Sequence, residues 1–447
     1  MNILQRKDLI DLSRLNAEMV FALNEASEDN LPLGFFLEPA HAATNFEFQG
    51  TRVSLLKLCL SAIKNGLLVS KTGLTLERNL LLIKNKDKYH FNAIMNPLVE
   101  HFSSNSEVMV AEELEKNSRG LFFRSGPINA IRLVIKTIRL SARAMRVYER
   151  FNYPINQELV KNLIFRMLMA FKFWQDTFKN SKVRFILVDT DHTQFAIPLL
   201  SAANSLNIES VTLQHGSLDH TLSYYPVIAN EMWCWGAQSE RVLLRAGLEK
   251  SRCIKVGNPV AKVNKETGRS YKKVIGFAFS GTHLEQTEKV VFENILSIPE
   301  LSDYQFILKL RPSLKPSEWM LNLPRVTVFE TGKGANTNID FLKLVDIVIV
   351  SISSFGFEAI AGGVPLWIHR ISENEGYLDA IMIREGGCPD ISQEHQLNYE
   401  VRKLIEKGKD YLDELYNQQQ SYLENDVYEY SGRASTERII KELADKV

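Results

Sequence analysis

The chain lacks an excess of charge of either sign, because 53 Lys and Arg residues balance 53 Asp and Glu residues over 447 positions. This balance argues against a general nucleic-acid-binding protein, so we expect no nucleic-acid partner. No apolar run reaches the roughly 18–20 residues that a membrane span needs, and the start, MNILQRKDLIDLSRL, lacks the apolar core of a secretory signal. We therefore expect the protein in the cytoplasm.

Cysteine is also scarce. The four cysteines, Cys59, Cys234, Cys253 and Cys388, are far apart and match neither a CxxC pair nor a metal-finger spacing. We interpret them as reduced structural residues, and we predict no metal site.

The composition, with 45% hydrophobic and 24% charged residues, is ordinary for a globular protein, and the length predicts two to four domains. Residues 1–180 are mostly helical in pattern, with apolar residues at helical spacing over 8–23 and 53–63. Within this region the short apolar run at 80–83 is a candidate strand. We therefore set a first boundary near residue 180.

From residue 183 onward, short β-rich runs alternate with helix-like stretches. A polar stretch at 262–273, KVNKETGRSYKK, separates two such series and predicts a domain boundary. The alternation predicts an α/β fold with parallel sheets and helices on both faces. We expect strands at 183–189, 210–213, 231–235, 274–279, 306–310, 326–329, 347–350 and 366–368, helices at 193–206, at 284–296 and through Glu358, and a helical, charged end over 396–447.

Polar residues follow several of these strands, at the carboxyl edge where open α/β sheets bind ligands. Ser353 and Ser354 follow the strand at 347–350 and precede a helix that contains Glu358. A helix start with hydroxyl groups suits a phosphate, and Glu358 could accept hydrogen bonds from a ribose. The alternative is an ordinary serine cap with a capping acid.

Two more strand ends of the second series bear candidate ligand-binding residues. Ser280, Gly281 and Thr282 form a turn in which the glycine lets a ligand approach the backbone closely. Lys309 and Arg311 end the strand at 306–310, and an arginine there could clamp a phosphate or carboxylate, or form a surface ion pair instead.

The first series offers two candidate bases. His215 follows the strand at 210–213 and precedes a glycine, and imidazole is well suited to exchanging protons near neutral pH. Asp191 follows the strand at 183–189, but it could also cap the next helix. The alternative for His215 is hydrogen bonding by neighbouring backbone. Spacing alone does not choose between the two as the catalytic base.

In this order, the motifs resemble a bacterial GT-B glycosyltransferase of the surface-polysaccharide type, related to capsule enzymes that transfer Kdo, sialic-type sugars or glycerol phosphate. The resemblance covers about residues 183–370 and extends to a closing helix, SGRASTERIIKEL, at 431–443. The matching segments are LQHG at 213–216, Tyr225-Pro226, WCWG at 233–236, VGNP at 256–259, KLRPS at 309–313 and SISSFGFEAIAGGVPLWI at 351–368.

The resemblance implies two Rossmann-like domains that face a cleft. It assigns 181–262 to the core of an acceptor domain, to which part of 1–180 also belongs, and 274–395 to a nucleotide-sugar donor domain. It implies no obligatory metal and no cofactor, with a CMP- or UDP-linked sugar as substrate. Carried over by position, Ser353, Ser354 and Glu358 would touch donor phosphate and ribose, Arg311 would neutralise the leaving group, and His215 would face the transfer centre.

One departure from the family's pattern keeps the donor open. Related capsule enzymes often have a histidine-proline pair where this chain has Arg311-Pro312.

A basic segment lies at 117–150, where eight Lys or Arg residues and the single acid Glu149 give a net charge of +7. Six of the cations alternate at spacings of four and three, which places them along one face of a helix. Such a helix suits an anionic membrane surface on the inner face of the plasma membrane, an ion-paired packing surface, or an anionic substrate. The six are Arg132, Lys136, Arg139, Arg143, Arg146 and Arg150.

The leading hypothesis is therefore a glycosyltransferase that moves a sugar from a nucleotide donor to a surface-polysaccharide or lipid-linked glycan. A nucleotide-sugar epimerase of similar build is an alternative, which would act without an acceptor. A non-catalytic scaffold that binds glycan or membrane is another, and it predicts a donor site without cations.

Overall fold

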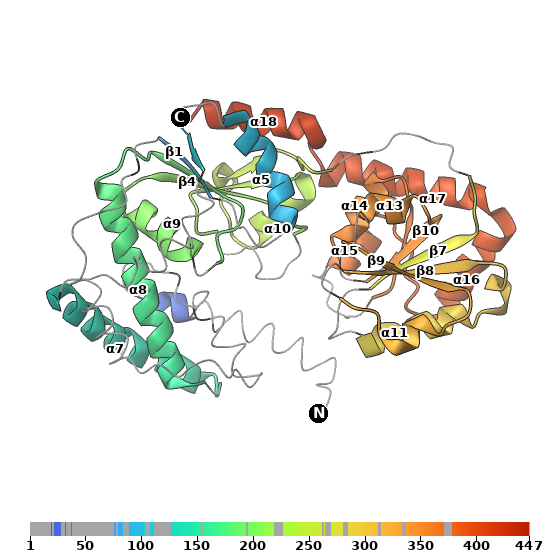
Figure 1. Cartoon of the computed structure of the whole chain (residues 1–447), viewed down its shortest axis with the longest axis horizontal. Coiled ribbons are helices and arrows are strands. Elements are labelled where there is room, and N and C mark those ends of the chain that lie inside the picture. The colour runs from blue at the N-terminus through green and yellow to red at the C-terminus, as the bar shows by residue number, and fades with distance from the viewer. Residues whose placement is uncertain are drawn as a thin grey trace.

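The computed structural model of the chain (Figure 1) describes residues 19, 22–27, 32, 37, 76, 79–83, 89–102, 108–110, 127–153, 155–193, 195–218, 227–261, 263, 270–279, 285–311, 314–332, 337–351, 353–370 and 378–446. Within them it forms two α/β halves, each built on a parallel sheet. The α/β class with two Rossmann-like domains is therefore confirmed. The predicted helix over 53–63 and most of that over 8–23 lie outside the described residues.

The first half contains a six-stranded sheet in the order β2-β1-β3-β4-β5-β6. All its strand pairs are parallel. The candidate strand at 80–83 is confirmed, and it brings part of the first 180 residues into this sheet. The strands are β1 Leu80–Ile83, β2 Val108–Val110, β3 Phe185–Val188, β4 Glu209–Leu213, β5 Glu231–Cys234 and β6 Cys253–Lys255.

The second half contains a five-stranded parallel sheet in the order β11-β10-β7-β8-β9. Its strands fall within one residue of the predicted ranges, because each is a short apolar run bounded by polar residues. They are β7 Val274–Ala278, β8 Gln305–Leu310, β9 Val326–Glu330, β10 Ile347–Val350 and β11 Leu366–Ile368.

Helices cover both faces of each sheet. Those of the first half are α5 Tyr89–Phe102, α7 Pro127–Arg150, α8 Gln157–Lys179, α9 Ala196–Ser205, α10 Ala237–Arg245 and the 3-10 turn η2 Lys250–Arg252. Those of the second half are α11 Glu285–Leu296, η4 Pro299–Leu301, α12 Glu318–Leu321, α13 Asn338–Leu342, α14 Phe355–Ala361, α15 Leu378–Arg384, α16 Glu394–Lys407, α17 Lys409–Tyr422 and η5 Leu423–Val427. The last helix, α18 Gly432–Ala444, returns to the first half (Figure 1).

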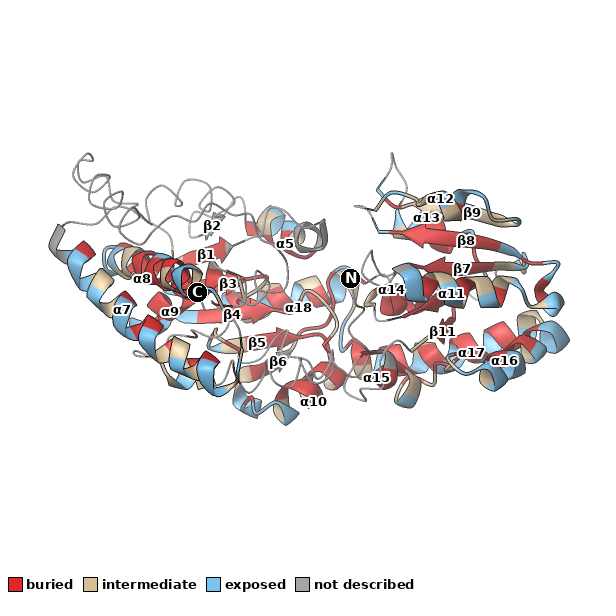
Figure 2. Cartoon of the chain, turned by 90° about the horizontal axis from the view of Figure 1, so that it is seen from below, coloured by how far each residue is buried: buried red, intermediate tan, exposed pale blue. Residues whose placement is uncertain are grey.

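Side-chain alternation along β3 explains the layering of the first half. Ile186 and Val188 pack into a core that α8, α9 and α10 share. Phe185 and Leu187 point to the other face, where α5 and α18 cover them. Because every residue of β3 is buried, the strand reads as a continuous apolar run, FILV. Figure 2 shows this buried interior between the two helical layers.

The residue after α15 and the segment between α17 and α18 fasten the second half to the first. Arg241 of α10 forms ion pairs with Glu385 at 2.8 Å and with Asp426 at 2.7 Å. The backbone amide of Asn258 donates to the carbonyl of Tyr430 at 2.9 Å. The two sheets are thus held together by contacts from η5 and the residues that follow it.

Glycine is required at position 257, where the first half contacts the segment that precedes α18. Its φ is +81°, and a Cβ built there would lie 2.1 Å from the carbonyl oxygen of Tyr430. Replacing Gly257 with alanine is therefore expected to destabilise the protein by about 3 kcal/mol, the sum of left-handed strain and a backbone clash. Thermal unfolding measures the loss. Gly247→Ala is the matched control, since Gly247 has φ +104° in an exposed turn, so a drop as large there would contradict this explanation.

Candidate functional site

His215 lies at the carboxyl edge of the first sheet, directly after β4. Its Nδ1 is 2.8 Å from the carbonyl oxygen of Asp189, which follows the neighbouring strand β3. A carbonyl oxygen only accepts hydrogen bonds, so Nδ1 carries the proton in the neutral ring. Nε2 then holds the lone pair, which is the arrangement that a general base requires.

Gln214 fixes the backbone beside His215. Its side-chain amide donates to the carbonyl of Gly216 at 2.7 Å, and its side-chain oxygen accepts from the backbone amide of Trp235 at 2.7 Å. The indole nitrogen of Trp235 donates to the backbone carbonyl of Gln214 at 3.1 Å. Because Gln214 is fully buried, these bonds hold the turn after β4 in one conformation. The sequence motifs LQHG and WCWG thus meet in space.

Asp191 is buried and has structural partners. Its Oδ2 accepts from the backbone amide of Ile228 at 2.8 Å, and its Oδ1 lies 3.6 Å from Nε2 of His192. At the start of α9 it is Thr193 whose hydroxyl accepts from the amide of Ala196, at 3.0 Å. A catalytic role for Asp191 stays a prediction. The bond of His215 to a backbone carbonyl also fits the structural alternative for that residue, so the choice of base stays a prediction.

Lys309 lies at the carboxyl edge of the second sheet, at the end of β8, with only 6% of its surface exposed. Its Nζ is 4.3 Å from the centroid of the Phe355 ring, which begins α14. Burial lowers the pKa of Lys309 to about 8, while the charge of Glu358 raises it and that of Arg311 lowers it. Lys309 is thus a buried ammonium beside an aromatic ring, under the influence of one carboxylate and one further cation.

Glu358 lies close enough to Lys309 to act on its charge, as the sequence positions suggested. Its Oε2 accepts from the side-chain amide of Asn338, the first residue of α13, at 2.6 Å. This bond orients the carboxylate at the sheet edge. Sequence reasoning missed Asn338, because no local pattern links it to a residue twenty positions later.

The two serines occupy the turn between β10 and α14. The hydroxyl of Ser353 accepts from the backbone amide of Phe355 at 3.2 Å, whereas Ser354 makes no side-chain capping bond. The helix α14 has only 7 residues. Arg311 is exposed just beyond Lys309. The predicted Ser280, Gly281 and Thr282 lie outside the described residues.

A short packed path connects the edges of the two sheets. The rings of Trp235 and Tyr428 lie 5.6 Å apart, centroid to centroid, and those of Tyr428 and Phe357 lie 6.4 Å apart. Trp235 is bonded to Gln214, the neighbour of His215, and Phe357 precedes Glu358. Burial raises the pKa of Tyr428, and the Glu358 charge raises it further, which places that carboxylate beside the path.

Among the residues that the structure describes, no group of three or more His, Cys, Asp or Glu side chains is arranged to hold a metal ion. The prediction that no metal or cofactor is needed stays a prediction. The described groups include a histidine at the edge of one sheet and two cations at the edge of the other.

Comparison with known proteins identifies the fold. No protein-family model matches this sequence, and no curated protein sequence matches it. The structure is similar to that of the UDP-GlcNAc 2-epimerase from Neisseria meningitidis bound to UDP-GlcNAc, with a TM-score of 0.50 and 14% identity, over 82% of this chain and 100% of that chain. A glycosyltransferase from Rickettsia africae gives a TM-score of 0.49 and 11% identity, over 83% of this chain and 98% of that chain. The GT-B-like fold is thus confirmed.

Proposed function

We propose that this protein is a glycosyltransferase that uses a nucleotide-activated sugar. The observation that supports this most is Lys309, a buried cation at the carboxyl edge of the second sheet that forms no ion pair with the residues the structure describes. A buried charge without an ion-pair partner is costly, and a nucleotide phosphate bound beside Lys309 and Arg311 would compensate it. Glu358, oriented by Asn338, would accept hydrogen bonds from the ribose.

In this proposal, residues at the carboxyl edges of the two sheets perform different steps of the reaction. Nε2 of His215 takes the proton from an acceptor hydroxyl as its oxygen bonds to the anomeric carbon of the sugar. The bond between that carbon and the phosphate oxygen breaks, and the nucleotide leaves with its electron pair. Lys309 and Arg311 stabilise the negative charge that develops on the phosphate.

The substrates in this proposal follow from the sequence resemblance. They are a CMP- or UDP-linked sugar and a glycan of a capsule or lipopolysaccharide, free or attached to a lipid, with no nucleic acid and no cofactor. We place the activity in the cytoplasm, where the donor would be a sugar activated by its nucleotide.

Epimerisation of a nucleotide sugar is a second candidate, and the similarity to the epimerase from N. meningitidis, solved with UDP-GlcNAc, favours it. Both reactions need a base and a nucleotide site. They differ in what becomes of the bond between the sugar and the phosphate.

Following UDP- and CMP-sugars by nuclear magnetic resonance separates the two functions. A transferase releases free nucleotide, slowly to water and faster when a glycan acceptor is added, and the sugar that remains on the nucleotide keeps its configuration. An epimerase changes the configuration at one sugar carbon while the nucleotide stays attached. Epimerised nucleotide sugar without free nucleotide would replace the proposed function with the second candidate.

Glu358→Ala is expected to raise the donor KM about tenfold, because a ribose contact worth roughly 1–2 kcal/mol is lost. Asn338→Ala should produce a smaller increase, since it frees the carboxylate without removing it. Steady-state kinetics with varied donor measures both. Unchanged turnover and KM in Glu358→Ala, or in Arg311→Ala, would remove these residues from the donor site.

A further inference from the structure

The helix α7 exposes a stripe of large apolar side chains to solvent. Ile131, Ile135 and Ile138 are 55%, 62% and 53% exposed. Their spacings of four and three place them on one side of the helix, one turn after another. A soluble protein usually exposes such residues singly, so an aligned set of three indicates a contact surface.

The opposite side of α7 anchors it to the protein. Leu140, Ala144 and Tyr148 are buried against residues of α8, including Ile164 and Leu168. The helix therefore packs on α8, which in turn packs on the first sheet. Figures 1 and 2 show α7 as the outermost layer of the first half, at the end of the molecule away from the second half.

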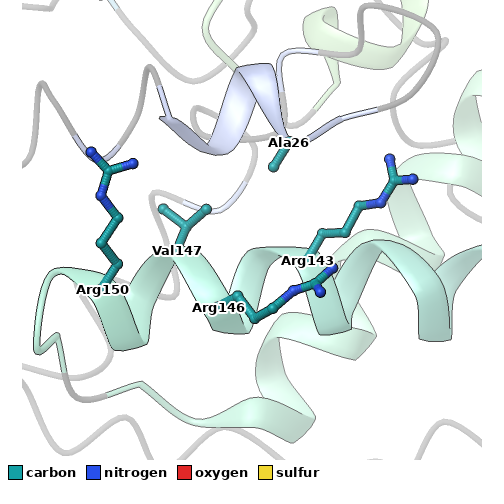
Figure 3. Close-up of a pocket in the computed structure, with 5 residues that line it drawn as sticks. All are labelled: Ala26, Arg143, Arg146, Val147 and Arg150. Atoms are coloured by element: carbon teal, nitrogen blue, oxygen red, sulfur yellow. The ribbon is translucent and has the colours of Figure 1, made fainter.

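Arginines lie along one side of α7, beside the isoleucine stripe and beyond its end. Arg132, Arg139, Arg146 and Arg150 are exposed, and Glu149 is the single acid of the helix. Toward the end of α7, Arg143, Arg146 and Arg150 line a pocket of about 400 Å³ with Val147 and with Ala26 (Figure 3). Among the residues that the structure describes, the lining is three arginines with two small apolar side chains, and guanidinium groups suit a phosphate group.

We propose that α7 docks the protein onto an anionic lipid bilayer. The helix has 24 residues, which is about 36 Å, and it lies along the surface with the isoleucines at the boundary of the acyl chains. The flanking arginines meet lipid phosphates, and one headgroup occupies the arginine-lined pocket. Among the described helices none is both long and apolar enough to cross a membrane.

A bilayer fits this face better than a protein partner does. The isoleucines and arginines run in parallel lines along a helix at the outer edge of the molecule, and a bilayer offers an apolar plane bordered by a plane of phosphates. This inference goes beyond the proposed function, because it concerns where the protein works and not which reaction it performs.

Co-sedimentation of the full chain with vesicles tests the proposal. We expect binding to phosphatidylcholine vesicles doped with phosphatidylglycerol, weaker binding as salt is raised, and little binding to pure phosphatidylcholine. Reversing Arg132 and Arg146 to glutamate should lower partitioning at least a hundredfold, at about 1 kcal/mol per charge. Arg139 and Arg143 are left in place because they make contacts within the protein.

Replacing Ile131, Ile135 and Ile138 with serine should lower partitioning roughly tenfold or more without unfolding, since all three are exposed. The matched controls are Ile405→Ser, at an isoleucine 43% exposed on α16, and the double reversal of Arg402 and Lys441, both exposed. These should bind vesicles as the wild type does.

Three outcomes would overturn the proposal. Wild-type protein that stays in solution with anionic vesicles would remove the bilayer as partner. Equal binding to neutral and anionic vesicles would remove the role of the arginines. An oligomer in solution that the serine variant dissociates would instead identify the stripe as a contact between copies of the chain.

Discussion

Replacing His215 with alanine should lower kcat by about 10²–10⁴-fold, the usual contribution of a general base. The donor KM and nucleotide affinity should stay nearly unchanged, because the donor is proposed to bind at the edge of the other sheet. The expectation depends on the bond between Nδ1 and the Asp189 carbonyl, which leaves the lone pair on Nε2. Single-turnover kinetics at saturating donor would measure the chemical step directly.

His395→Ala is the matched control, since His395 is an exposed histidine on α16 of the second half. It should leave kcat unchanged. If His215→Ala keeps more than about a tenth of the wild-type kcat, general-base catalysis by this residue is wrong. Asp191 would then become the leading candidate at the same edge.

Replacing Lys309 with methionine should weaken nucleotide diphosphate binding roughly a hundredfold, because a buried, charge-assisted contact to phosphate is lost. Methionine keeps much of the length and the apolar stem. Removal of the isolated buried charge should not unfold the protein, since it relieves a desolvation cost. Isothermal titration calorimetry gives the affinity, and thermal unfolding verifies the fold.

The same variant should change the pH dependence in a defined direction. Burial lowers the pKa of Lys309 to about 8 in the free protein, and a bound phosphate favours the protonated form. Wild-type affinity should therefore fall as pH rises through about 8, whereas Lys309→Met should show no such fall. Phosphate itself loses its last proton near pH ~6, well below this window.

The stability of the ligand-free protein should also depend on the protonation of Lys309. The unfolded chain binds more protons than the folded chain between pH about 8 and the ordinary lysine pKa of 10.5. This site therefore makes the free energy of unfolding rise with pH across that window, by about 3 kcal/mol at most, and methionine removes the rise. An identical pH profile in both proteins would mean that Lys309 titrates normally.

Local sequence patterns predicted much of the second half. The run IVIV at 347–350 is fully buried, and the observed strand has the predicted bounds. Which strands pair with one another could not be predicted from these patterns. β10 pairs with β7, some seventy positions earlier, and no pattern in either strand specifies the other. β2 and β6 have 3 residues each and were missed, whereas β11 is equally short and was predicted.

The site residues also fall into two groups: those that a local sequence pattern predicts, and those that only the fold brings together. Lys309 and Ser353 were predicted because one lies at the end of a strand and the other just after a strand, so a one-dimensional pattern places them at the binding edge. The bond between Asn338 and Glu358 and the ring contact between Trp235 and Tyr428 join distant segments. Only the folded structure distinguishes the two candidate phosphate-binding cations. The sequence favoured Arg311, whereas the structure buries Lys309 and exposes Arg311.

The central claim is that a nucleotide binds beside Lys309. A thermal-shift screen of the wild type and Lys309→Met against CMP, CDP, UDP, GDP and dTDP tests it most directly, since a ligand that binds only the folded state raises the unfolding temperature. The account predicts that nucleotides with one nucleobase, cytosine or uracil, raise the unfolding temperature of the wild type by several degrees and that of the variant much less. No shift with any nucleotide, or an equal shift in both proteins, would contradict it.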